Sequence, residues 1–173
     1  GLEIRPSSKE ELSSLCRHLA QKLNELRPLV KEDENGVMIS SFLSAEEQGD
    51  AARDAFNSLH EEYPLLSPGY SNPKAVMNSR VMSWFHITGV YFPFTFEANV
   101  NVDVPDYSIP ATMCHELSHL RGFMREDEAN FIGYLACCRS ESWDFQYSGY
   151  MLAFVYVNNA LYSADAETAS AIY

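Results

Sequence analysis

The chain has 173 residues, the size of one domain, and its 12 basic and 24 acidic side chains give a net charge of −12. Such an acidic surface argues against nucleic acid or anionic lipid as the main partner, because both require a basic face. Hydrophobic residues make up 46% of the chain, too many for a disordered segment. The composition therefore indicates an acidic globular domain, and function has to be inferred from local motifs.

Two helices are predicted in the first half of the chain. Ser8 and Glu11 fit a capping box, and leucines then recur at spacings of three and four residues, which predicts a helix to about residue 29. Ser44 and Glu47 fit a second capping box, and the helix that they begin should end before Pro64.

The middle of the chain changes character. Residues 75–85 have a mixed apolar pattern that fits a strand or a short helix. Residues 90–104 are rich in Val, Tyr, Phe and Thr, which predicts a strand. Because Pro93 has no N–H to donate to a neighbouring strand, this should be an edge strand.

Helices are predicted again in the last third of the chain, and the order of elements indicates one α+β domain. This domain has a helical N-terminal part at about residues 8–63 and a second part at about residues 75–173. The predicted helices of the second part cover about residues 110–121, 126–139, 148–162 and 165–173.

The most informative motif is the HExxH sequence at residues 115–119. His115 and His119 are four residues apart on a predicted helix, so both imidazoles share one face and can reach a single zinc ion. Glu116 is rotated by about 100° around the helix axis and can instead reach a water on the metal. This is the position of a general base, so the motif predicts a catalytic zinc site.

A catalytic zinc needs a third protein ligand and one open position. Arg125 stands where the longer pattern HExxHxxGxxH would have its third histidine, so that pattern is broken. The next residues, Glu126, Asp127 and Glu128, offer three carboxylates on a new helix. A turn at Gly122 would bring one of them back to the metal, and the spacing alone does not choose among them.

An HExxH sequence followed by a helix with the pattern E-x-x-A-N, here residues 126–130, resembles the gluzincin clan of zinc metallopeptidases. The resemblance implies that Glu126 is the third ligand and that Asn130 is a second-sphere residue that supports His115. Glu128 stays the competing candidate for the third ligand, because it is also acidic and nearby. It also implies a zincin-like fold, in which a small mixed sheet has an edge strand above an active-site helix and is surrounded by helices.

A second resemblance covers most of the chain after residue 75. It rests on five segments, at residues 89–101, 114–119, 121–123, 125–131 and 147–150. Together they resemble an uncharacterised family of bacterial membrane-tethered zinc peptidases, in which membrane spans precede a soluble domain. The resemblance implies that this chain is that soluble domain, without indicating the side of the membrane that it faces.

Substrate contacts can be assigned only by the resemblance to the zincins. In zincins the edge strand pairs with an extended peptide, which here implies contacts from Phe92, Phe94, Thr95 and Glu97. Hydrolysis also needs a donor to the developing oxyanion. Tyr147 and Tyr150 follow the helix that carries Glu126 and are candidates, but in a chain with ten tyrosines aromatic packing is the favoured interpretation of both.

The leading hypothesis is a zinc-dependent metallopeptidase that hydrolyses a peptide or protein through a metal-activated water, with Glu116 as general base. Two alternatives stay open. One is a membrane-linked regulatory or sensor zincin with restricted or no proteolysis, and the other is a non-catalytic binding domain with a structural metal site. A catalytic zinc keeps one open position, whereas a structural zinc has four protein ligands, so the ligand set discriminates.

Overall fold

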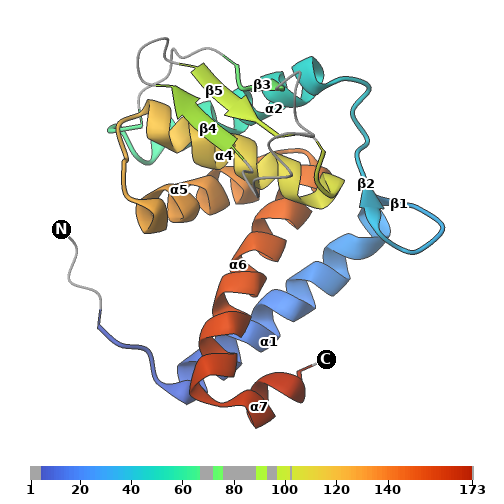
Figure 1. The fold of residues 1–173 in the computed structure, drawn as a ribbon, viewed down its shortest axis with the longest axis vertical. Coiled ribbons are helices and arrows are strands. Elements are labelled where there is room, and N and C mark those ends of the chain that lie inside the picture. Colours follow the sequence, from blue (N-terminus) through green and yellow to red (C-terminus); the bar gives the residue numbers. More distant parts are fainter. Residues whose placement is uncertain (1–4, 67–71, 76–88, 93–96, 102, 173) are drawn as a thin grey trace.

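The computed structural model describes residues 5–66, 72–75, 89–92, 97–101 and 103–172. These residues form a mostly helical domain with two small sheets (Figure 1). The helices are α1 (Lys9–Leu26), α2 (Ala45–Ser58), α4 (Ile109–Leu120), α5 (Glu126–Arg139), α6 (Trp143–Ala164) and α7 (Ala166–Ser170), with 3₁₀ turns η1 (Arg27–Leu29), η2 (Leu59–Glu61) and η3 (Asp106–Ser108).

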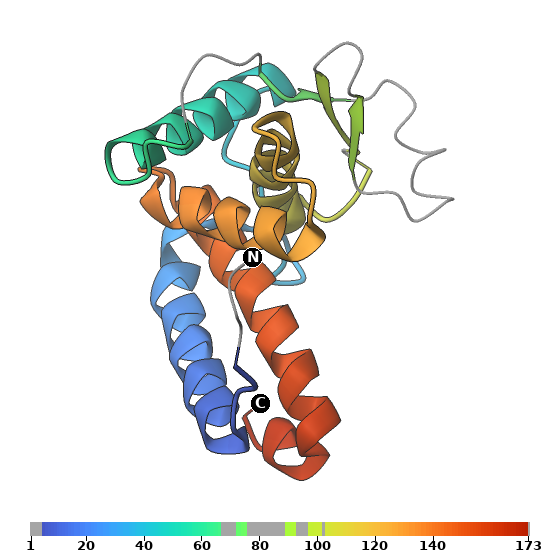
Figure 2. The ribbon, with the colours of Figure 1, turned by 90° about the vertical axis from the view of Figure 1, so that its left-hand side faces the viewer.

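Helices α1 and α6 form a long pair that extends from the rest of the domain, and α7 lies at its far end (Figures 1 and 2). The predicted leucine face of α1 is confirmed in part, since Leu19, Leu23 and Leu26 are buried, together with Cys16, whereas Leu15 is exposed. Helix α1 therefore contacts the rest of the domain mainly through α6. None of the described helices is both long enough and apolar enough to cross a bilayer.

The two predicted capping boxes have different outcomes. At α1 the box is complete, because Ser8 accepts from the Glu11 N–H and the Glu11 carboxylate accepts from the Ser8 N–H. At α2 only half of it forms. Ser44 accepts from the Glu47 N–H, but the Glu47 carboxylate accepts from Leu43 one residue earlier.

The three-stranded sheet has the order β3-β5-β4 and is mixed. Strand β5 (Glu97–Val100) pairs in parallel with β3 (Lys74–Ala75) and antiparallel with β4 (Gly89–Phe92). A separate two-stranded hairpin consists of β1 (Lys31–Glu32) and β2 (Met38–Ile39). Figure 2 shows the larger sheet beside α4, and both β4 and β5 contact that helix.

The prediction of one strand over residues 90–104 is wrong. The segment contributes two paired strands, and β4 ends at Phe92, directly before Pro93. An edge strand does exist, because β4 has β5 on one side and no strand of the described residues on the other.

The main core lies where α2, α4, α5 and the start of α6 meet. Its fully buried side chains include Phe56, Met113, Leu117 and Phe145. Helix α4 is the centre of this packing, since it contacts α2, α5, α6 and the larger sheet. Buried neighbours on so many sides hold the HExxH helix in a fixed position.

Candidate metal centre

The HExxH helix ends in a turn that reverses the chain. Gly122 has φ +91°, which a residue with a Cβ adopts only under strain. Its N–H donates to the His119 carbonyl, and the Phe123 N–H donates to that of Ser118, the pattern of a Schellman motif. This turn directs α5 back along α4, as the glycine in the sequence suggested.

The reversal brings three candidate ligands together. His115 Nε2 lies 3.0 Å from His119 Nε2, and the Glu126 carboxylate oxygens lie 3.3 Å from the first and 3.5 Å from the second. One ligand atom from each residue falls within 4.8 Å of the others. The three residues predicted as metal ligands therefore converge in space.

The partners of the other ring nitrogens determine what these residues offer. His115 Nδ1 lies 2.9 Å from the amide oxygen of Asn130, and His119 Nδ1 lies 2.7 Å from the Phe123 carbonyl oxygen. Both partners only accept, so each neutral imidazole carries its proton on Nδ1 and a lone pair on Nε2. Two lone pairs and a carboxylate then lie close together, and such a set could hold a metal ion.

This geometry fits zinc. Two nitrogens bound at about 2.0–2.1 Å to a tetrahedral ion stand ~3.3 Å apart, close to the 3.0 Å between the two Nε2 atoms. The Glu126 side chain is 75% exposed, so solvent reaches the site from its side. Two histidines and one carboxylate leave a tetrahedral ion with one position not filled by these three residues.

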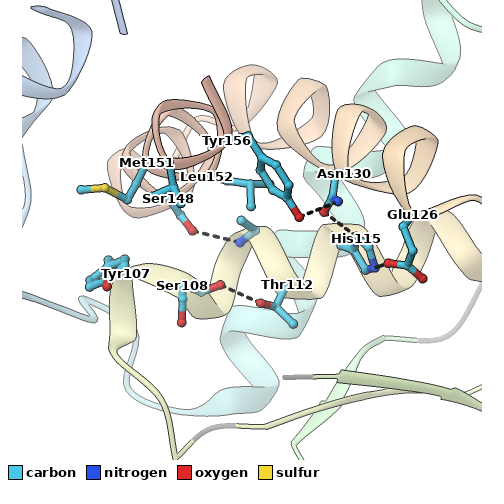
Figure 3. A pocket seen from close by; sticks show the side chains of 12 residues that line it. Tyr107, Ser108, Thr112, His115, Glu126, Asn130, Ser148, Met151, Leu152 and Tyr156 are labelled. Atoms are coloured by element: carbon cyan, nitrogen blue, oxygen red, sulfur yellow. Dashed lines mark hydrogen bonds and ion pairs between the residues drawn. The ribbon is translucent and has the colours of Figure 1, made fainter. Parts of the chain in front are cut away.

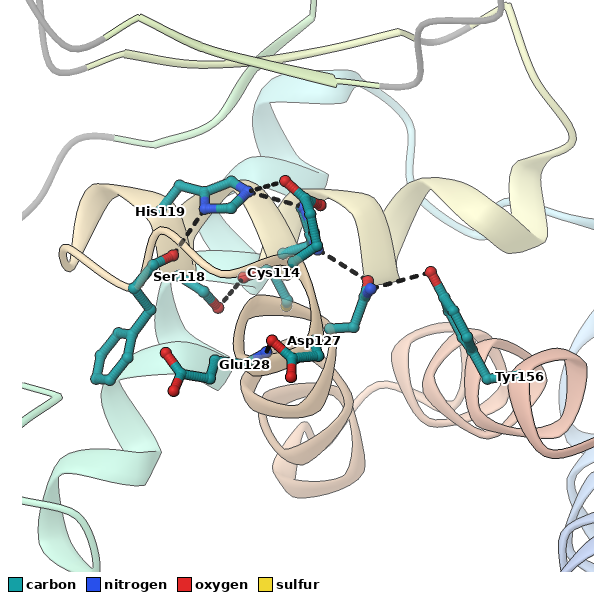
Figure 4. A network of polar contacts seen from close by, with 10 residues as sticks. Cys114, Ser118, His119, Asp127, Glu128 and Tyr156 are labelled. Atoms are coloured by element: carbon teal, nitrogen blue, oxygen red, sulfur yellow. Dashed lines mark hydrogen bonds and ion pairs between the residues drawn. The ribbon is translucent and has the colours of Figure 1, made fainter. Parts of the chain in front are cut away.

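Glu128, the competing candidate for the third ligand, lies beside Arg125 and not beside the two histidines. Glu128 approaches Arg125, with 3.9 Å between its carboxylate and the guanidinium, and Asp127 pairs with the same guanidinium. Figure 4 shows Asp127 and Glu128 away from His119. Residue 125, which breaks the longer histidine pattern, thus binds the neighbouring carboxylates, and Glu126 is the one that reaches both imidazoles.

Glu116 has the environment expected of a proton acceptor of raised basicity. Its side chain is 5% exposed, and its Oε2 has no hydrogen-bond partner among the described residues. Burial, and secondly the charge of Glu126, raise the pKa of Glu116 to about 7. A cation at the three ligands would supply the missing favourable interaction and lower that pKa.

A cavity of about 310 Å³ opens beside His115, Glu126 and Asn130 (Figure 3). Its other walls come from η3, α4 and α6 and carry mostly apolar side chains. The hydroxyls of Ser108 and Thr112 donate to backbone carbonyls, and that of Ser148 accepts from a backbone N–H. Besides His115, Glu126 and Asn130, the cavity is lined by Tyr107, Ser108, Ala111, Thr112, Ser148, Met151, Leu152, Val155 and Tyr156.

The proposed oxyanion donors lie away from this cavity. The Tyr150 ring packs edge-on against Tyr134, with 5.9 Å between centroids, and Tyr147 lies near Arg27 and Glu32. Neither belongs to the described residues that line the cavity. Tyr156 lies there instead, two turns further along α6.

Of the four predicted substrate contacts, Phe94 and Thr95 lie outside the described residues. Phe92 and Glu97 are paired across β4 and β5. The structure thus places the backbone of these two residues in the sheet beside α4. Two contacts around the candidate ligands had no sequence signal. The first is that of the Phe123 carbonyl with His119, because any residue has a carbonyl, and the second is that of Tyr156 with Asn130, because the two lie 26 positions apart.

Comparison with known proteins adds a family assignment. The family model described as "Protein of unknown function (DUF3810)" matches residues 1–173. No curated protein and no solved structure matches the chain. The match spans the whole chain that carries the three converging ligands, and the chain belongs to the DUF3810 family.

Proposed function

We propose that this domain is a zinc-dependent metallopeptidase of gluzincin type. The observation that carries the proposal is the convergence of two Nε2 lone pairs and the Glu126 carboxylate beside a buried Glu116 oxygen that has no hydrogen-bond partner in the described part of the chain. A purely structural site would need a fourth protein ligand. No further His, Cys, Asp or Glu joins this group among the described residues.

In this proposal His115, His119 and Glu126 hold the zinc ion, which when bound supplies a Lewis acid that polarises a peptide carbonyl and makes water more acidic. Glu116 takes the proton of the attacking water and delivers it to the leaving nitrogen. Asn130 and the Phe123 carbonyl keep both imidazoles in the tautomer that binds metal.

The surroundings support a peptide as the substrate. Strand β4 is an edge of the larger sheet and contacts the HExxH helix, so an extended peptide could pair with it in the zincin-like manner. The neighbouring cavity offers an apolar lining and no Lys or Arg among its described residues. We therefore propose an uncharged apolar side chain next to the cleaved bond. The tethering of the domain to a bacterial membrane is likewise a proposal.

Zinc binding is the first test. The protein is stripped with a chelator, and its zinc affinity is measured by competition with a chromophoric chelator. Glu126→Gln should weaken binding at least tenfold, because a neutral amide is a poor zinc ligand. Glu128→Gln is the matched control, two residues away on the same helix, and should bind like the wild type. Equal affinities of the two variants would exclude Glu126 as a ligand.

Hydrolysis is the second test. The zinc-loaded protein is assayed with a quenched fluorescent peptide library, and Glu116→Gln is compared with it. The variant should retain zinc and lose turnover, because glutamine cannot accept the proton. Full activity of Glu116→Gln would refute its role as general base. Zinc bound with no turnover of any peptide by the wild type would favour the regulatory alternative.

A further inference from the structure

Asn130 connects His115 to a side chain on a third helix. Its Oδ1 lies 2.9 Å from His115 Nδ1, and its Nδ2 donates to the Tyr156 hydroxyl at 2.9 Å. The three residues come from α4, α5 and α6, and these helices pack against one another in every pair. Figure 3 shows the contacts running from Tyr156 through Asn130 to His115 beside Glu126.

The orientation of the Asn130 amide determines where His115 carries its proton. An amide has an acceptor on one side and two donor hydrogens on the other. With Oδ1 toward the ring, the proton stays on Nδ1 and the Nε2 lone pair faces His119 and Glu126. A rotated amide would place an N–H against Nδ1, draw the lone pair to that side and remove one metal ligand.

The Tyr156 hydroxyl holds this amide from the side opposite to His115. Tyr156 is 56% exposed, so water could satisfy its hydroxyl, and the fold does not need this bond to avoid an unpaired buried group. The hydroxyl nevertheless accepts a hydrogen bond from Asn130 Nδ2 at an ordinary distance of 2.9 Å. Rotation of the amide breaks that contact, which raises the cost of the orientation that disables His115.

We propose that Tyr156 is a positioning residue for the metal centre, holding Asn130 so that His115 Nε2 remains available to the metal. The proposal rests on the proposed function, since it concerns the same three ligands. Tyr156 also lines the cavity beside Glu126. The residue that orients His115 is therefore part of the wall that a bound peptide would touch.

Zinc affinity in a double-mutant cycle tests this proposal. Tyr156→Phe removes only the hydroxyl and should weaken zinc binding about tenfold, the lower range for loss of a residue that orients a metal ligand. Asn130→Ala should weaken it at least as much. The double variant should bind no more weakly than Asn130→Ala alone, because both changes act through one contact. Tyr162→Phe, at another exposed position of α6, should bind like the wild type.

The tautomer of His115 in the metal-free protein gives a second readout that a general loss of stability does not move. Ring nitrogen chemical shifts should place the proton on Nδ1 in the wild type and show more of the Nε2-protonated ring in Tyr156→Phe. Normal zinc affinity and an unchanged tautomer in Tyr156→Phe would overturn the role of Tyr156 alone. Failure of the wild type to bind zinc would overturn both this role and the proposed function.

Discussion

Gly133 on α5 lies where that helix comes closest to the HExxH helix. A Cβ at this position would stand 3.0 Å from the backbone nitrogen of His115, 3.3 Å from its Cα and 3.4 Å from the carbonyl carbon of Cys114. Gly133→Ala would therefore press a methyl group against the backbone of a candidate metal ligand. We expect it to change both stability and zinc binding.

The magnitude follows from two opposed terms. Alanine is favoured over glycine inside a helix by about 1 kcal/mol. Overpacking a rigid core costs about 1–3 kcal/mol. The three atoms that the methyl group meets are backbone in a helix with buried neighbours on several sides, so they cannot rotate away. We expect the overpacking cost to exceed the gain in helix propensity, so that the free energy of unfolding falls by about 1 kcal/mol.

Zinc binding should fall as well, although no ligand is changed. Separating the helices by a few tenths of an ångström moves Glu126 relative to His115, and metal–ligand distances tolerate only about 0.2 Å. Zinc affinity should drop about tenfold, which is comparable with the effect of removing a residue that hydrogen-bonds a metal ligand.

Urea denaturation of the metal-free protein and zinc competition measure the two effects separately. Gly49→Ala on α2 is the control, because its Cβ would stand 2.9 Å from the backbone oxygen of Pro73, in a contact that involves neither α4, α5 nor α6. It should lower stability and leave zinc affinity nearer to that of the wild type. A Gly133→Ala protein with wild-type stability and zinc affinity would refute the idea that this close approach positions Glu126.

Three further predictions concern stability. Hydrogen bonds from Arg5 and Ser8 lower the pKa of Glu11 from 4.5 to about 2, so the contribution of the carboxylate is present above pH 4.5 and lost as pH falls toward 2. Thermal melts should therefore show Glu11→Gln less stable than the wild type at pH 7, with most of the difference lost by pH 2. Asp144→Ala should cost about 2 kcal/mol in urea denaturation, because the buried carboxylate accepts from both the N–H and the hydroxyl of Ser41. Zinc at one hundred times its Kd should raise the free energy of unfolding by about 2.7 kcal/mol, reversibly with chelator, and an unchanged melting temperature would contradict metal binding.

Elements with strong local signals agree between sequence and structure. The helix expected at 126–139 has those bounds, and the capping box at Ser8 is complete. The helix expected at 148–162 instead runs from Trp143 to Ala164, and its first turn carries the buried Asp144 and Phe145. The expected strand over 90–104 is instead two strands, because pairing partners cannot be read from one segment.

The sequence by itself determined that His115 and His119 share one helix face with Glu116 beside them. That relation depends only on the helical repeat, which neighbouring residues set. It also indicated a reversal at Gly122, because a positive φ favours glycine.

Only the tertiary structure decided which carboxylate faces the histidines and what surrounds them. The packing of α5 against α4 places the carboxylate of Glu126, and not that of Glu128, beside the histidines. The packing of α6 against α5 brings Tyr156 to Asn130. The burial of Glu116 likewise depends on side chains from other elements. Such contacts join residues distant in the chain, and they depend on how whole helices fit together, which no local pattern of residues encodes.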